Sequence, residues 1–173
     1  FYCNPPLEQT IKTVYSDKQR LHALKAEISS GKARPTYEKP ERADMVVKRI
    51  QQLAFGEIVE PEEYSIDLAT KVHDAQYVEF LQSCWPQWEE KFGPDNDAMA
   101  SVFCHPDLKR YRPQHIEAQL GYYAFDQTVG LGKDSWAAIK SAMDVALTGA
   151  DLIINGESSA FSLCRPPGHH ASS

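Results

Sequence analysis

The feature that most restricts the fold is a long helical stripe of apolar residues that leads directly into a short apolar strand. Ser135 is a suitable N-cap for this helix, and Asn155-Gly156 is a suitable stop. The residues 160–163 that follow are typical of a buried strand. A helix, a tight turn and a strand in this order predict an α/β fold with a central parallel sheet. The stripe consists of Trp136, Ile139, Met143, Ala146, Ala150 and Ile153.

The earlier part of the chain predicts further elements of the same kind. Residues 11–15 and 57–60 are short β-branched segments that favour strands. A helix is expected through Val46, Ile50 and Leu53, with Gly56 as its stop, and another is expected after the N-cap Ser65, through Leu68 and Val72. A third is expected from Asp74 to Trp85, where Pro86 should end or kink it, with Trp85 and Trp88 as core anchors. Residues 31–40 and 92–113 are expected to be loops.

Composition and charge exclude several classes of protein. The chain has 173 residues, 42% of them hydrophobic, which excludes general disorder. Its 24 acidic and 18 basic side chains give a net charge of −6, which predicts no affinity for nucleic acid or anionic membranes and is compatible with a cationic ligand. Most acidic proteins bind no such ligand. Four scattered cysteines, with no visible signal peptide, are typical of reduced thiols in the cytoplasm.

The loop after the last predicted strand carries the residues best suited to chemistry. It contains Pro166, Pro167 and Gly168, followed by His169 and His170. Ligands bind beyond the carboxyl ends of strands in open α/β sheets, and two prolines restrict the movement of such a loop. Each histidine can accept or donate a proton near neutral pH. Without that context, a histidine pair near a chain end is often a surface feature or the remnant of a tag.

Several segments, in the same order along the chain, resemble the zinc-dependent histone deacetylase superfamily, and most closely its acetylpolyamine amidohydrolase branch. The resemblance covers roughly residues 11–173. The segments are Tyr15-Ser16-Asp17, Pro40-Glu41-Arg42-Ala43, Lys71-Val72-His73-Asp74-Ala75, Ile116-Glu117-Ala118-Gln119-Leu120-Gly121-Tyr122-Tyr123 and Phe161-Ser162-Leu163-Cys164-Arg165-Pro166-Pro167-Gly168-His169-His170-Ala171.

The resemblance implies an α/β, arginase/deacetylase-like three-layer fold with a central parallel sheet. It implies that a zinc ion helps to hydrolyse the acetamide of a cationic amine, and that the protein is a homodimer. His169 would orient the attacking water, and His170 would be the general base and then the general acid. In the family the zinc is held by an Asp-x-His pair and a further Asp, all downstream of the histidine pair. We therefore expect Zn2+ in the complete domain and no metal ligands in this chain.

The domain boundaries follow from the same resemblance. Residues 1–10 are expected to be a leader of unknown origin, and residues 11–173 to be the amino-terminal part of a catalytic domain cut after the histidine loop. Such a chain alone would lack activity.

Two carboxylates are candidate substrate-binding residues because of where they lie in the resemblance. Glu117 and Glu27 would attract a cationic polyamine near the entrance of the site. The alternative is that both are solvated surface charges. For the function as a whole, the alternatives are a protein lysine deacetylase and a non-catalytic fragment that acts as a folding or association module.

Overall fold

The centre of the molecule is a three-stranded parallel sheet, seen in a computed structural model that describes residues 10–105, 107, 111–124, 126–128 and 130–168. Its strands lie in the order β4 (Ile58–Val59), β1 (Lys12–Val14) and β7 (Ala160–Ser162). Thr13 of β1 pairs with Ile58 on one side and with Phe161 on the other. The predicted parallel sheet and all three of its predicted strands are confirmed.

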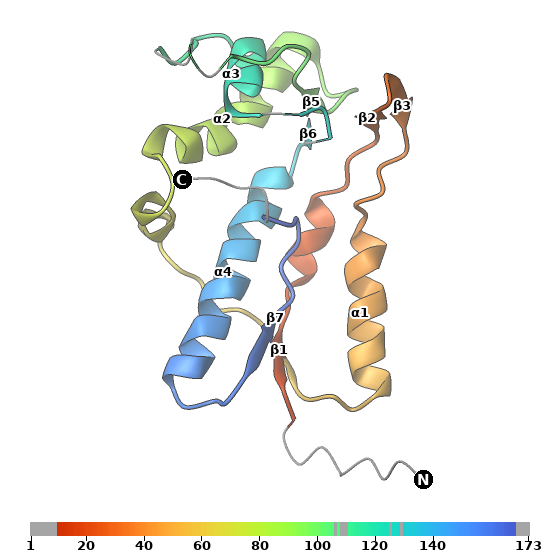
Figure 1. Cartoon of the computed structure of the whole chain (residues 1–173), viewed down its shortest axis with the longest axis vertical. Helices are drawn as coiled ribbons and strands as arrows, with labels where there is room; N and C mark the ends of the chain where they lie inside the picture. The colour runs from red at the N-terminus through yellow and green to blue at the C-terminus, as the bar shows by residue number, and fades with distance from the viewer. Residues whose placement is uncertain (1–9, 106, 108–110, 125, 129, 169–173) are drawn as a thin grey trace.

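Two helices flank this sheet on opposite sides (Figure 1). Helix α1 (Pro40–Gln52) begins with Pro40, whose missing N–H is not needed in a first turn, and it buries Ala43 and Ile50. Helix α4 (Ser135–Ile154) packs against β7, β1 and the 3₁₀ helix η1 (Asp17–Leu21). Both helices were predicted from apolar spacing. Ser135 is the first residue of α4 rather than its N-cap, which is Asp134.

The face that α4 buries differs from the predicted one. Within the apolar stripe, Ala146 and Ala150 are exposed and Ile153 is 47% exposed, although Ile139 packs against the core. The buried residues are Ser135, Ala138, Ser141, Asp144, Val145, Thr148 and Gly149. A Cβ on Gly149 would lie 2.0 Å from the Ser162 hydroxyl, so small residues let the helix approach the sheet closely. The prediction of the buried face was wrong because it ranked residues by hydrophobicity, whereas close approach selects small ones.

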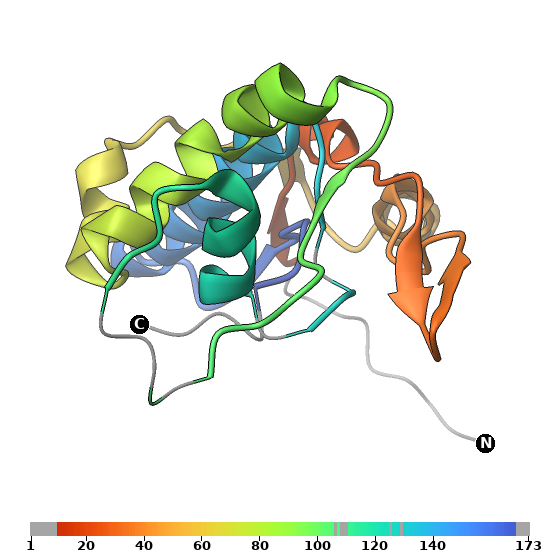
Figure 2. The same cartoon turned by 90° about the horizontal axis from the view of Figure 1, so that it is seen from above.

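A second layer covers the amino-terminal end of α4 (Figures 1 and 2). It consists of α2 (Ala75–Phe92), α3 (Ile116–Tyr123) and the antiparallel pair β5 (Ala98–Met99) and β6 (Gly130–Leu131). Trp88 packs against its core, and Trp85 is buried too, which confirms the prediction for both tryptophans. The core cluster consists of Phe80, Cys84, Ala98, Ala100, Ile116, Leu120 and Leu131.

Helix α2 does not end or break at Pro86 but continues to Phe92, where Gly93 follows it. A proline inside a helix removes one hydrogen bond, and the core contacts of Phe80, Cys84 and Trp85 on the same helix offset that loss. The expected helix after Ser65 is the 3₁₀ helix η2 (Ile66–Lys71), and Ser65 caps it as predicted by accepting the Asp67 N–H. Val72 lies just beyond it and is 65% exposed.

Two short elements occur where loops were expected. Strands β2 (Glu27–Ser29) and β3 (Lys32–Arg34) form an antiparallel hairpin, and β5 lies within the expected loop 92–113. All three residues of β3 are exposed, so the segment lacks the alternation of polar and apolar residues that predicts a strand. No helix in the described part of the chain is long and apolar enough to cross a lipid bilayer.

Candidate functional site

The chain passes from β7 into the loop that the sequence identified as the candidate site. The structure describes this loop from Leu163 to Gly168. His169 and His170 lie outside the described residues, so their predicted catalytic roles stay predictions. What the structure does show is how the residues just before them are held.

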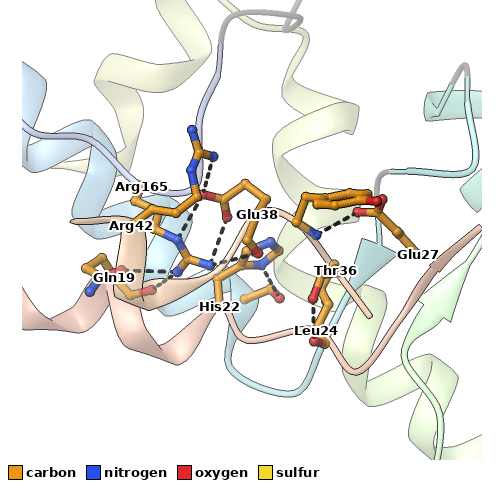
Figure 3. Close-up of polar contacts among 10 residues, drawn as sticks. Gln19, His22, Leu24, Glu27, Thr36, Glu38, Arg42 and Arg165 are labelled. Atoms are coloured by element: carbon orange, nitrogen blue, oxygen red, sulfur yellow. Dashed lines mark hydrogen bonds and ion pairs between the residues drawn. The ribbon is translucent and has the colours of Figure 1, made fainter. Parts of the chain in front are cut away.

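Arg165 is the fixed point of this loop. Its side chain is 3% exposed and its guanidinium lies between Gln19 of η1 and Glu38, which precedes α1 (Figure 3). Nη1 donates to the Gln19 backbone oxygen at 2.6 Å and to its Oε1 at 3.1 Å. Nε donates to Glu38 Oε1 at 3.1 Å, and Nη2 lies 2.8 Å from Glu38 Oε2. All three guanidinium nitrogens are therefore engaged, and the buried charge is paired.

Glu38 connects two arginines. Its carboxylate also accepts a hydrogen bond at 3.3 Å from Nη1 of Arg42, which lies in the first turn of α1. Gln19 is held in turn, because its Nε2 donates to the Tyr15 hydroxyl at 3.3 Å. The loop after β7, the end of β1 and the start of α1 are thus joined by one polar network. Sequence reasoning missed Gln19 and Glu38 as site residues. The only signal was Arg165 itself, since a buried arginine needs an acidic partner.

His22 lies beside this network in the neutral form. Its Nδ1 is 2.8 Å from Ser135 Oγ, which also accepts the Gly132 N–H. Burial, and secondarily the positive charge of Arg165, lower the pKa of His22 from 6.5 to about 4. The site therefore keeps a single charged base, Arg165, next to an uncharged imidazole at neutral pH.

An open groove of about 620 Å³ runs between α1 and the outer part of β7. Arg42 and Arg165 contribute to its wall, and Phe161 and Leu163 line it from the sheet side. The remaining lining residues are Glu38, Ala43, Met45, Val46, Arg49, Ile50, Leu53, Phe55, Cys164 and Pro167. The groove thus combines a largely apolar lining with two arginines, directly at the approach to the histidine loop.

The structure does not bring the two candidate substrate carboxylates into this groove. Glu117 lies in the first turn of α3, about half exposed, and forms an ion pair with Lys91 of α2. Glu27 lies in β2, is 8% exposed, and its Oε2 accepts the Tyr37 N–H at 3.2 Å. The reading of Glu27 as a solvated charge is therefore wrong. Whether either residue binds substrate stays a prediction.

The described residues were also compared with what a metal ion requires. Nowhere among them do three or more His, Cys, Asp or Glu side chains come together in a way that could hold a metal. Three cysteines, Cys84, Cys104 and Cys164, are free thiols. Burial raises the pKa of the Cys84 thiol to about 12, so it is a poor ligand or nucleophile. The described part of the chain therefore offers no fit for zinc, and we derive no step through a metal here.

Comparison with known proteins agrees with the fold and the loop. Residues 36–173 match the histone deacetylase domain, and the chain belongs to that family. It is 40% identical over 159 residues to acetylpolyamine amidohydrolase 2 of Pseudomonas aeruginosa, and 39% identical over 161 residues to acetylpolyamine amidohydrolase 1 of the same organism. Each of these alignments covers 92% of this chain and 46% of the relative. The chain thus spans about half the length of these curated relatives.

A solved structure shows the same architecture. The acetylpolyamine aminohydrolase from Burkholderia pseudomallei superposes with a TM-score of 0.85 at 29% sequence identity. The match covers 94% of this chain and 46% of that one. The predicted deacetylase-like α/β fold with a central parallel sheet is therefore confirmed.

Proposed function

We propose that the full-length protein hydrolyses the acetyl amide of acetylated polyamines or related small amines, releasing acetate and the free amine. The observation that carries this proposal is the 40% identity to an acetylpolyamine amidohydrolase over 92% of the chain, which includes the histidine loop. The buried Arg165 network adds support, because it provides a fixed base for that loop. By itself the 173-residue chain is proposed to be inactive.

The chemistry assigned to this chain's own residues is proton transfer. His170 takes a proton from the attacking water and later gives it to the nitrogen of the departing amine, while His169 orients the water by a hydrogen bond. A zinc ion, which the family resemblance implies and which ligands beyond Ser173 would hold, supplies polarisation of the amide carbonyl. The proposal includes a cationic substrate attracted by Glu117 and Glu27, and the net charge of −6 is compatible with it.

The test is an acetate-release assay on the full-length protein, with N-acetylated diamines and acetyl-lysine peptides as substrates. We expect turnover of the diamines, and a loss of about 10²-fold or more in His170→Ala, from the usual contribution of a general base. A bound metal content equal in wild type and variant is the control for folding. No acetate release from either substrate class, with zinc supplied, would contradict the proposal.

A second candidate is protein lysine deacetylation, which the match of residues 36–173 to the histone deacetylase domain favours. The same assay separates the two, because this alternative requires faster turnover of the peptides. A third is a non-catalytic folding or association module, which predicts that neither substrate is cleaved. We further propose a homodimer, and a cytoplasmic location supported by the three free thiols.

A further inference from the structure

We infer that Arg165 is a positioning residue for the histidine loop, and that Glu38 and Gln19 act through it. The inference rests on the proposed function and deepens it. It assigns to this network the task of fixing where the chain leaves β7 and enters the loop that carries His169 and His170.

The first argument is the number and direction of the contacts. Arg165 is held from two sides, by Gln19 of η1 and by Glu38 at the approach to α1 (Figure 3). Nη2 also donates to the Glu38 backbone oxygen at 3.4 Å. A planar guanidinium that is held through all three nitrogens cannot rotate or shift without losing several hydrogen bonds at once. A lysine would retain the charge and lose this geometry.

The second argument is that the anchoring partners are themselves fixed. Gln19 is 2% exposed and is tied to the hydroxyl of Tyr15, directly after β1. Glu38 lies two residues before the first residue of α1 and is bonded to Arg42 within that helix. Arg165 is therefore referenced to both the central strand and a flanking helix, rather than to another mobile loop.

The third argument is the short distance along the chain from the anchor to the histidines. Only Pro166, Pro167 and Gly168 separate Arg165 from His169. The two prolines have fixed φ angles, so a displacement at Arg165 passes along the chain with little absorption before Gly168. Because a misplacement of about 1 Å can reduce a rate about 10²-fold, the network affects the rate without touching substrate.

The experiment compares Arg165→Lys, Glu38→Gln and Gln19→Leu in the full-length protein. We expect kcat to fall about 10-fold to 10²-fold in the first two and less in Gln19→Leu, which keeps the backbone acceptor. KM should change less than threefold. The matched control is Asp144→Asn, which weakens another buried ion pair, to Lys140, on the α4 face that contacts residues 62–64. It should reduce thermal stability and leave kcat within twofold.

A second readout does not depend on activity. Amide hydrogen exchange of residues 163–168 should become at least tenfold faster in Arg165→Lys and Glu38→Gln and stay unchanged in Asp144→Asn. The inference is overturned if exchange there is unaffected, or if kcat falls no more than in the control at equal stability. If the wild type cleaves neither substrate, the proposed function fails, while the exchange measurement still decides whether Arg165 holds the loop. Gln19→Leu, the mildest change, serves if the charge variants do not fold.

Discussion

At the scale of single residues, two basic side chains illustrate how the fold decides which charges it retains. Arg165 is buried with its charge because Glu38 and Gln19 satisfy it. His22 is buried without one, since burial and the nearby Arg165 both disfavour protonation. The consequence is a measurable dependence of stability on pH.

The first prediction is that acid destabilises the protein through His22. Its pKa is lowered from 6.5 to about 4, so between these values the unfolded chain binds a proton that the folded chain does not. The contribution of neutral His22 is therefore complete above pH 6.5 and is lost as the pH falls toward 4, by about 3 kcal/mol in total. Urea unfolding at pH 7 and pH 4.5 should show a smaller loss in His22→Asn, which retains a polar partner for Ser135. Equal losses in variant and wild type would contradict this.

The second prediction concerns Gly121, where α3 is crossed by another part of the chain. A Cβ there would lie 1.8 Å from the Val102 carbonyl oxygen, and the Cys104 N–H donates to the Gly121 oxygen at 2.9 Å. Gly121→Ala should therefore destabilise the protein by about 2 kcal/mol or more, although alanine favours a helix by about 1 kcal/mol. Ala118→Gly, at an exposed position of the same helix, is the comparison and should cost only about 1 kcal/mol. The reverse order in thermal unfolding would show that Val102 moves away easily.

At the scale of elements, the sequence predicts where helices lie better than which side they bury. The spacing from Trp136 to Ile153 is sufficient to identify α4, because a period of 3.6 residues depends on the helix alone. The buried face depends on what packs against the helix. In α4 the Gly149 face lies against β7, and the polar residues Asp144 and Thr148 are buried because residues 62–64 donate to them.

The candidate site divides in the same way. The histidine loop is recognisable because its chemistry is contiguous in sequence. Its support is not, since Gln19 and Glu38 are separated from Arg165 by 146 and 127 residues. Such long-range pairing leaves no local pattern, and Glu38 lies in a stretch that the sequence describes only as a loop.

The third prediction tests the polar face of α4. Thr148 Oγ1 accepts the Glu62 N–H at 2.9 Å, so Thr148→Val leaves that N–H without an acceptor in a partly buried place. We expect a loss of about 1–2 kcal/mol in urea unfolding and faster hydrogen exchange at residues 62–64. Thr70→Val is the matched control, because the exposed Thr70 hydroxyl only donates to a nearby carbonyl in η2. If the two variants lose equal stability, the buried acceptor contributes nothing of its own.

At the scale of the whole molecule, the sheet is open on the side of β7. Among the described residues β7 pairs only with β1, and α1 stands away from Phe161 across the groove. Several apolar side chains on this side are exposed, at 66% for Met45, 54% for Leu53 and 38% for Phe161. An unpaired edge beside an apolar surface promotes association between chains. The alignments, which cover 46% of the relatives, agree with a surface that further chain covers in those proteins.

The fourth prediction is that the 173-residue chain, prepared by itself, associates through this side. Sedimentation velocity from about 1 to 100 µM should show a growing fraction of dimers and larger species, accompanied by binding of a hydrophobic dye. The double variant Met45→Glu, Leu53→Glu places two charges in the groove and should restore the monomer, because burying them between chains is costly. Tyr111→Glu, at a residue that is 86% exposed elsewhere, is the control and should leave association unchanged. A chain that stays monomeric at all concentrations, or a control as effective as the groove variant, would show that the open side of β7 does not drive association.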